Sequence, residues 1–266
     1  ELGARTSYAD LTRSAGGCAT IDWTRGAPEV FVGRFVEVQE LALDPTTQPE
    51  AKLTRVAARR LACKNCGGPL ELFDPQHART IACPSCNMLL EVTSEALVAA
   101  QAQKLLHAAP RIRLGLETKL RGEDVRVMGY LHRAVKSGGI SYPWSEYLLR
   151  TANGEYRWLV ENNGHWILAT PIEPGAVKAR SRSATYQGAS FKHFDGGKAK
   201  VLTVLGEFYW QVRVGDEALV DDYIGDGRMV SLERDQKELA ASQSVHLEPA
   251  EVAQAFQLQK RVPQRG

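Results

Sequence analysis

The chain has 266 residues, 44% of them hydrophobic and 24% charged, which is typical of a globular protein with a sizeable core. Its formal net charge of +2 excludes a strongly basic surface that would attract nucleic acid or an anionic membrane as a whole. No apolar run approaches the ~20 residues of a membrane-spanning helix, so we expect no transmembrane segment.

Cysteine usage indicates a reducing compartment. Five cysteines in 266 residues are too few for the disulfide framework of a secreted protein, and four of them follow a metal-binding pattern. The sequence also opens without a basic and then apolar leader. We therefore expect a cytoplasmic protein.

Residues 1–49 form the first predicted segment, which is rich in β-forming residues. Two apolar stretches, 18–23 and 29–43, flank a turn-like Arg-Gly-Ala-Pro, and a loop with two prolines follows at 44–49. We expect a small β segment here.

Residues 50–92 contain the strongest motif of the chain. Cys63 and Cys66 form one CxxC pair, Cys83 and Cys86 form a second, and residues 67–82 separate the two pairs. This spacing predicts a four-cysteine zinc ribbon, because two tight turns with two thiolates each complete a tetrahedron around zinc. The alternative, disulfide bonds or unrelated thiols, fits the spacing less well.

The predicted zinc site is structural. Four thiolates leave no open coordination position for a substrate or a reactive water. Gly67 and Asn87 follow the second cysteine of each pair and tolerate the positive φ that such turns usually require. A site of this kind supplies roughly 10 kcal/mol or more of folding free energy, and we expect it to hold a segment that lacks a core of its own.

The remaining chain divides into three further segments. Residues 93–109, rich in Ala and Gln, are predicted as a helical linker. Residues 110–247 are predicted as an aromatic-rich β domain of short strands, with turns at 153–154, 162–164 and 196–197. Residues 248–266 are predicted as a C-terminal helix and tail, with Pro249 in the first turn. The whole pattern predicts a mainly β fold: an antiparallel sandwich or partly closed barrel, plus a small zinc ribbon and two short helices.

Large aromatic side chains recur in the predicted strands of the β domain. Rings of this size usually form the core or pair across strands. The alternative is an aromatic-lined groove that binds a peptide, a cation or a loop of a partner, with carboxylates nearby as counter-charges. The candidate binding surface consists of Trp144, Glu146, Trp158, His165, Trp166 and Trp210.

Several of these aromatic motifs together resemble a known family. The runs YPWSEYLL at 142–149, RWLV at 157–160, GEFYWQV at 206–212 and MVSLE at 229–233 are similar in order and spacing to the bacterial domain-of-unknown-function family 4178. The resemblance covers residues of about 110–246. Members often carry tandem copies with a zinc ribbon between or before them, and residues 20–23 and 32–37 resemble the end of a preceding copy. The resemblance thus implies that an N-terminal portion of the natural protein precedes this chain.

The resemblance transfers no activity and no catalytic residue. It implies, as a hypothesis, a bacterial context of phage-shock-type membrane stress or of polyamine metabolism. The residues themselves also give no support for catalysis. Phosphate-binding, nucleophile-elbow and HExxH motifs are missing from the sequence, and the six histidines are scattered. Asp221 and Asp222 are adjacent in a predicted strand, so their side chains point to opposite faces rather than forming an acid–base pair.

We therefore expect a non-enzymatic zinc-binding adaptor or scaffold with a protein partner, although a site assembled by the fold leaves the question of an enzyme open. Two alternatives stay open. One is nucleic-acid binding through the ribbon, where a local run of basic residues would contact phosphates. The other is a ligand-binding protein or enzyme linked to polyamines. The basic run consists of Lys52, Arg55, Arg59, Arg60 and Lys64.

Overall fold

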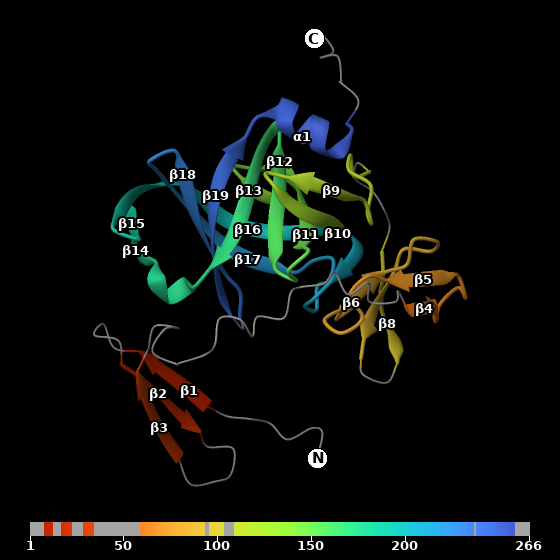
Figure 1. The fold of residues 1–266 in the computed structure, drawn as a ribbon, viewed down its shortest axis with the longest axis horizontal. Coiled ribbons are helices and arrows are strands. Elements are labelled where there is room, and N and C mark those ends of the chain that lie inside the picture. Colours follow the sequence, from red (N-terminus) through yellow and green to blue (C-terminus); the bar gives the residue numbers. More distant parts are fainter. Residues whose placement is uncertain are drawn as a thin grey trace. The chain divides into compact units, whose positions relative to one another are not determined.

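The computed structural model describes residues 8–12, 17–22, 29–34, 59–93, 96–103, 109–236 and 238–258 (Figure 1). The chain divides into two compact units, Glu1–Lys52 and Leu53–Gly266. None of the helices in the described part has the length and apolar character that a membrane crossing requires.

The first unit contains a three-stranded antiparallel sheet. The strands are β1 (Tyr8–Thr12), β2 (Gly17–Asp22) and β3 (Glu29–Arg34), in the order β1-β2-β3. Strands β2 and β3 fall in the two stretches for which the sequence predicts β structure. Three consecutive residues of β3, Val30, Phe31 and Val32, have exposed side chains.

The second unit begins with the cysteine-bearing ribbon. Strand β4 (Arg59–Ala62) pairs with β5 (Pro69–Leu72), and β6 (Thr80–Ala82) pairs with β7 (Met88–Val92), which in turn pairs with β8 (Leu97–Ala102). The prediction of a helical linker at 93–109 is therefore wrong over β8. The prediction that the ribbon lacks a core is also wrong, because a small apolar cluster packs beside the cysteines: Leu70, Leu72, Ala78, Ile81, Leu90 and Leu97.

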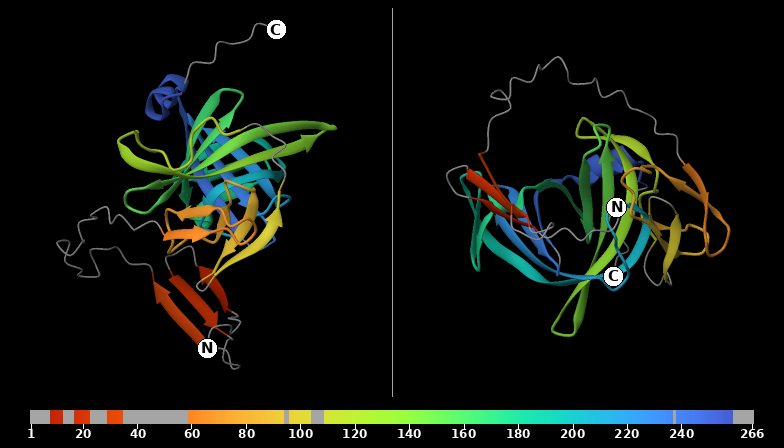
Figure 2. Two further views of the ribbon diagram at one scale, coloured as in Figure 1. Left: turned by 90° about the vertical axis from the view of Figure 1, so that its right-hand side faces the viewer. Right: turned by 90° about the horizontal axis from the view of Figure 1, so that it is seen from below.

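A closed barrel of eight antiparallel strands follows the ribbon. Of the two predicted folds, a sandwich or a barrel, the structure therefore shows the barrel. Around the barrel the order is β10-β11-β12-β13-β19-β18-β17-β16, and β16 pairs with β10 to close it (Figures 1 and 2). The strands are β10 (Glu123–Ser137), β11 (Ile140–Thr151), β12 (Tyr156–Asn162), β13 (His165–Ile172), β16 (Ala189–Phe208), β17 (Glu217–Gly225), β18 (Arg228–Arg234) and β19 (Leu239–Leu247).

Shorter elements extend or cover this barrel. Strand β9 (Glu117–Leu120) pairs with β10, and the connection from β13 to β16 contains η3 (Pro174–Ala176), β14 (Lys178–Arg180) and β15 (Ser183–Tyr186). Helix α1 (Pro249–Phe256) confirms the predicted C-terminal helix, with Pro249 in its first turn. The predicted turn at 162–164 is confirmed as well, since Asn163 and Gly164 have φ values of 50° and 85°.

The glycine pair at 196–197 is not the turn that the sequence predicts. Both residues lie inside β16, which runs without a break from Ala189 to Phe208. A Cβ at Gly197 would lie 2.8 Å from a methyl carbon of Val135 on β10. The glycine therefore makes room for the Val135 side chain of the neighbouring strand rather than reversing the chain.

An ion pair between Arg133 and Glu233 identifies the inner face of the barrel. Arg133 lies on β10 and Glu233 on β18, and two strands separate them along the shorter way around the wall. Strands are about 4.8 Å apart, so the two side chains can meet only across the concave interior. Because side chains alternate along a strand, this contact assigns one face of every barrel strand to the inside.

The outer face carries the largest apolar cluster. Helix α1 contributes Val252 and Phe256 to this cluster, and the segment before β9 contributes Ile112. They cover the outward-facing side chains of neighbouring strands, which are Tyr130, Tyr147, Leu159, Trp166 and Leu247.

Candidate metal centre

Two tight turns bring the four predicted cysteines together. In each turn an amide closes back on the first cysteine: Gly67 N–H donates to Cys63 O at 2.8 Å, and Asn87 N–H donates to Cys83 O at 2.9 Å. Gly67 and Asn87 have φ values of 73° and 59°. The left-handed conformation expected at these two positions is therefore confirmed.

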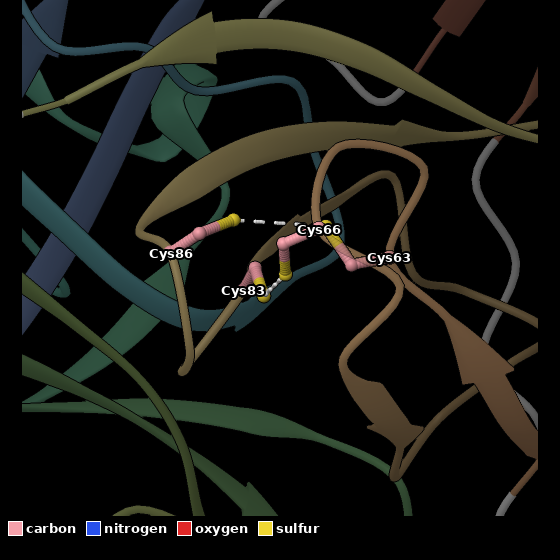
Figure 3. A group of neighbouring side chains, drawn as sticks. All are labelled: Cys63, Cys66, Cys83 and Cys86. Atoms are coloured by element: carbon pink, nitrogen blue, oxygen red, sulfur yellow. Dashed lines mark hydrogen bonds between the residues drawn. The ribbon is translucent and has the colours of Figure 1, made fainter.

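The four sulfur atoms have the spacing of a tetrahedral site (Figure 3). All four lie within 4.8 Å of one another, and the pairs Cys63–Cys86 and Cys66–Cys83 are each 3.8 Å apart. Sulfur atoms about 2.3 Å from a common metal ion lie about 3.8 Å apart at the corners of a tetrahedron. A disulfide needs a sulfur–sulfur distance of about 2.0 Å, so the cysteines are free thiols.

Amide groups around the cluster point towards sulfur. The backbone amide of Asn65 donates to Cys63 Sγ and that of Gly68 donates to Cys66 Sγ, both at 3.4 Å. The side chain of Asn65 donates to Cys86 Sγ at 3.5 Å. Such donors stabilise thiolate over thiol. The four sulfurs and their amides can hold one divalent metal ion.

The thiols differ in how readily they ionise. Hydrogen bonds from the Asn65 side chain and from the Met88 amide lower the pKa of the Cys86 thiol to about 6. The Gly68 amide acts in the same direction on Cys66, but the neighbouring Cys86 sulfur opposes it and the pKa of the Cys66 thiol rises to about 12. Sulfurs in contact cannot all carry charge without a cation between them, which is the role that a bound metal ion fills.

A buried carboxylate fixes the ribbon to the barrel. Glu207, near the end of β16, accepts the backbone amides of Phe73 and Asp74 at 2.6 and 2.8 Å. Its side chain lies 3% exposed. Burial raises the pKa of the Glu207 carboxyl to about 7, and the two amide hydrogen bonds act against that rise.

Asp74 of the ribbon is itself held by barrel side chains. Its carboxylate lies 2.7 Å from Arg150 Nε and accepts a hydrogen bond of 3.0 Å from the Tyr156 hydroxyl. His77 Nδ1 lies 2.9 Å from the same carboxylate. Burial acts to raise the pKa of Asp74, but His77, Arg150 and Tyr156 together hold it below its usual value.

Two glutamine side chains at the end of the ribbon form hydrogen bonds with the barrel backbone. Each side-chain amide donates to the C=O and accepts from the N–H of one residue, as the backbone of a paired strand would. Gln101 donates to Val214 O and accepts from Val214 N, and Gln103 forms the same two bonds with Val204. Together with the β6–β16 pairing, these contacts join ribbon and barrel into one unit.

The predicted aromatic binding surface is divided between several places. Trp144 and Glu146 lie together on the inner face, where Trp144 Nε1 donates to Glu146 at 2.6 Å. Trp158, also on the inner face, packs edge-on against Trp210 with ring centroids 5.5 Å apart. Trp166 is only 2% exposed, beneath the outer layer. His165 is exposed and lies beside His246. The six predicted residues therefore do not form one surface.

The inner face contains charged residues that the sequence reading did not single out. Arg133 is 6% exposed and donates two hydrogen bonds to Glu233, at 2.7 and 2.9 Å, and two to Glu146, at 3.1 and 3.4 Å. The available signal was the alternation in β10, where an arginine stands between inward-facing Leu131 and Val135. Asp222 is a further inward residue, whereas Asp221 contacts His193 on the opposite face, as the strand alternation predicts.

The predicted basic run lies mostly outside the described side chains. Lys52 and Arg55 fall outside the described residues, and Arg59 and Arg60 are described only as part of β4. Lys64 is exposed in the first cysteine turn. Nucleic-acid binding through this run stays a prediction.

Comparison with known protein families gives a match over the barrel. The family described as Domain of unknown function (DUF4178) matches residues 113–249, the segment that contains the barrel and the start of α1. No curated protein matches the chain, and no solved structure does.

Proposed function

Because the chain belongs to the DUF4178 family, whose description leaves the function open, we propose from its geometry that it is a non-catalytic binding scaffold built around a structural zinc ion. The observation that carries this proposal is the cluster of four cysteine sulfurs within 4.8 Å of one another. Zinc is the metal that a tetrahedral all-thiolate site most often holds. Full coordination by protein leaves the ion no position for a substrate.

The ribbon contacts support a scaffold role for the metal. The ion would fix both turns, and the second turn leads directly into β7 and β8, whose ends Gln101 and Gln103 attach to the barrel. A site that holds these strands also holds Asp74 against Arg150. Metal binding thereby stabilises the ribbon–barrel junction as well as the ribbon.

The first experiment measures metal in the purified full chain and the geometry of its site. Elemental analysis should give one zinc per chain, and exchange for cobalt(II) should give the intense absorption of tetrahedral thiolate coordination. Removal of zinc by a chelator should increase amide hydrogen exchange at 59–93 and 96–103 far more than in β11–β13. Absence of stoichiometric metal, or an octahedral cobalt spectrum, contradicts the proposal.

The adaptor role, with a protein partner, is supported by the tip of the β10–β11 hairpin. This hairpin extends beyond the other barrel strands in the left view of Figure 2, and its side chains Ile140 and Tyr142 are 59% and 53% exposed. Exposed apolar side chains on a projecting hairpin suit burial against another protein.

Affinity capture with the wild-type chain and with the double substitution Ile140→Ser, Tyr142→Ser tests this role. A partner that the wild type retains at physiological salt and the variant loses, at an unchanged melting temperature, supports the adaptor. Equal recovery with both chains contradicts a docking role for the hairpin.

A further inference from the structure

The inner face of the barrel has an apolar part, where Leu131, Leu148 and Val204 pack together, and a polar part on β17, β18 and β19. In a small closed barrel, inward side chains normally fill the interior with apolar packing. Here the outward face carries the largest apolar cluster, and the inward positions of β17, β18 and β19 include Asp222, Ser231, Glu233, Ser242 and Ser244. Such a composition suits a polar guest better than a packed core.

Inward side chains also remain partly accessible. Trp158, Val160 and Ile167 face the interior on β12 and β13, yet each keeps an intermediate exposure. Their outward neighbours Leu159 and Trp166 are 0% and 2% exposed. Solvent therefore reaches part of the inner face on these two strands, although Ala169 on the same face is buried.

Negative charge exceeds positive charge on this inner face. The inward carboxylates Glu146, Glu233 and Asp222 surround Arg133, and Arg150, a second arginine on this face, pairs with Asp74 of the ribbon. Glu233 and Glu146 already share the Arg133 guanidinium. Asp222 has its hydrogen bond with Ser231 rather than with a cation.

Two buried polar atoms on opposite walls make no hydrogen bond. Ser244 is 2% exposed, and its Oγ lacks a partner. It lies on β19, the strand opposite β10 in the barrel order. Directly paired residues of neighbouring strands point to the same face. Ser244 is paired with Ala169 on β13, and Ala169 is paired with the inward-facing Trp158 on β12, so Ser244 also faces inward. On β10 the Nε of Arg133 is buried and unpaired as well. Buried polar groups are nearly always paired in proteins, so the Ser244 hydroxyl calls for a ligand or a water molecule. The N–H of Arg133 needs an acceptor such as water and does not pair with a cation.

We propose that the barrel interior binds a small organic cation through a primary ammonium group, with Asp222 and Glu233 as its counter-charges and Ser244 as a hydrogen-bond partner. The aromatic groups on the other side are the rings of Trp144, which also contacts the Arg133 guanidinium, and of Trp158, which packs against Trp210. An ammonium group gains from carboxylates and from aromatic faces at the same time. An anionic guest would meet an excess of carboxylates, because Arg133 is already paired with Glu146 and Glu233 and Arg150 with Asp74.

Calorimetric titration of the full chain with three probes of equal length tests the charge. The probes are n-butylammonium, n-butanol and n-butyrate. Binding of n-butylammonium at millimolar concentration, at least tenfold weaker binding of n-butanol and none of n-butyrate are the expected results. Absence of saturation by n-butylammonium, equal binding of all three, or tighter binding of n-butyrate overturns the proposal.

Two substitutions place the binding inside the barrel. Asp222→Asn should weaken n-butylammonium binding about tenfold or more, whereas Asp226→Asn in the exposed turn between β17 and β18 should leave it unchanged. Ser244→Ala should weaken binding severalfold and raise the melting temperature of the free chain, because it removes an unpaired buried hydroxyl. Unchanged affinity in both Asp222→Asn and Ser244→Ala, with melting temperatures showing both to be folded, overturns the assignment of the site. None of these results depends on the metal content of the cysteine cluster, so this proposal and the zinc scaffold can fail separately.

Discussion

Arg150 of the barrel and Asp74 of the ribbon form a partly buried ion pair, with Arg150 Nε 2.7 Å from Asp74 Oδ2. The Asp74 side chain is 3% exposed and that of Arg150 is 26% exposed. The family match begins at residue 113, so this ion pair joins the matched domain to the ribbon that precedes it. The stability of the whole second unit should depend on this junction.

We expect Asp74→Asn to lower the free energy of unfolding by about 3 kcal/mol, because it leaves Arg150 without its counter-charge at a buried site. Urea unfolding at neutral pH measures the loss. Asp124→Asn is the matched control: Asp124 pairs with Lys119, both side chains are more than half exposed, and such a pair contributes about 0–1 kcal/mol. Equal losses in the two variants would contradict a special role for the junction.

Replacement of one cysteine should remove the metal and loosen the ribbon. We expect Cys83→Ser to abolish stoichiometric zinc and to lower the melting temperature, because the remaining three thiolates do not complete the tetrahedron. Elemental analysis and thermal unfolding of the same sample measure both effects. Cys18→Ser is the control, since Cys18 lies on β2 in the first unit. A zinc content that survives in Cys83→Ser would exclude the four-sulfur site.

The metal centre is the part of the structure that the sequence predicts best, and the reason is its local character. Two CxxC turns and the positive φ of Gly67 and Asn87 follow from a few adjacent residues, so no knowledge of the rest of the fold is needed. The hairpin turn at Asn163-Gly164 was predictable for the same reason.

The errors arise where distant strands override local preference. Residues 97–102 are rich in Ala and Gln, which favours a helix, yet they pair with β7 and Gln101 binds Val214 over a hundred residues away. Gly196 and Gly197 suggest a turn, but the approach of Val135 decides their conformation. The cluster around Arg133 joins β10, β11 and β18. The alternation in β10 places Arg133 on the face of Leu131 and Val135, but the local sequence does not indicate that Glu233, a hundred residues away, meets it there.

Glu207 should make stability depend on pH between about 4.5 and 7. Its carboxyl has a pKa of about 7 in the folded chain and about 4.5 when unfolded. In this window the folded state keeps a proton that the unfolded state has lost, so stability falls as pH rises and levels off above pH 7. The pKa difference corresponds to about 3 kcal/mol.

The substitution Glu207→Gln tests this dependence. Glutamine stays neutral at every pH, but its NH₂ group cannot accept one of the two amides of Phe73 and Asp74, which costs about 1–3 kcal/mol. The variant should therefore be less stable than the wild type at pH 5, and the difference should shrink towards pH 8. Urea unfolding of both chains at the two pH values measures the difference, in which the pH dependence of zinc binding cancels. A constant difference would contradict the raised pKa.

Arg133→Met should be the most destabilising of these substitutions at neutral pH. Two carboxylates, Glu146 and Glu233, would lose their common partner inside the barrel, and breaking a buried ion pair in this way costs about 3–5 kcal/mol. Burial already raises the pKa of Glu146 with the arginine present. Without Arg133 the buried Glu146 carboxyl would take up a proton more readily, so the variant should regain stability as pH falls from 7 to 5. Lys198→Met, which removes the cation from an exposed pair with Glu217, should change stability by less than about 1 kcal/mol. If Arg133→Met loses no more stability than Lys198→Met, or fails to recover at pH 5, then the buried cluster does not carry the charge that its geometry indicates.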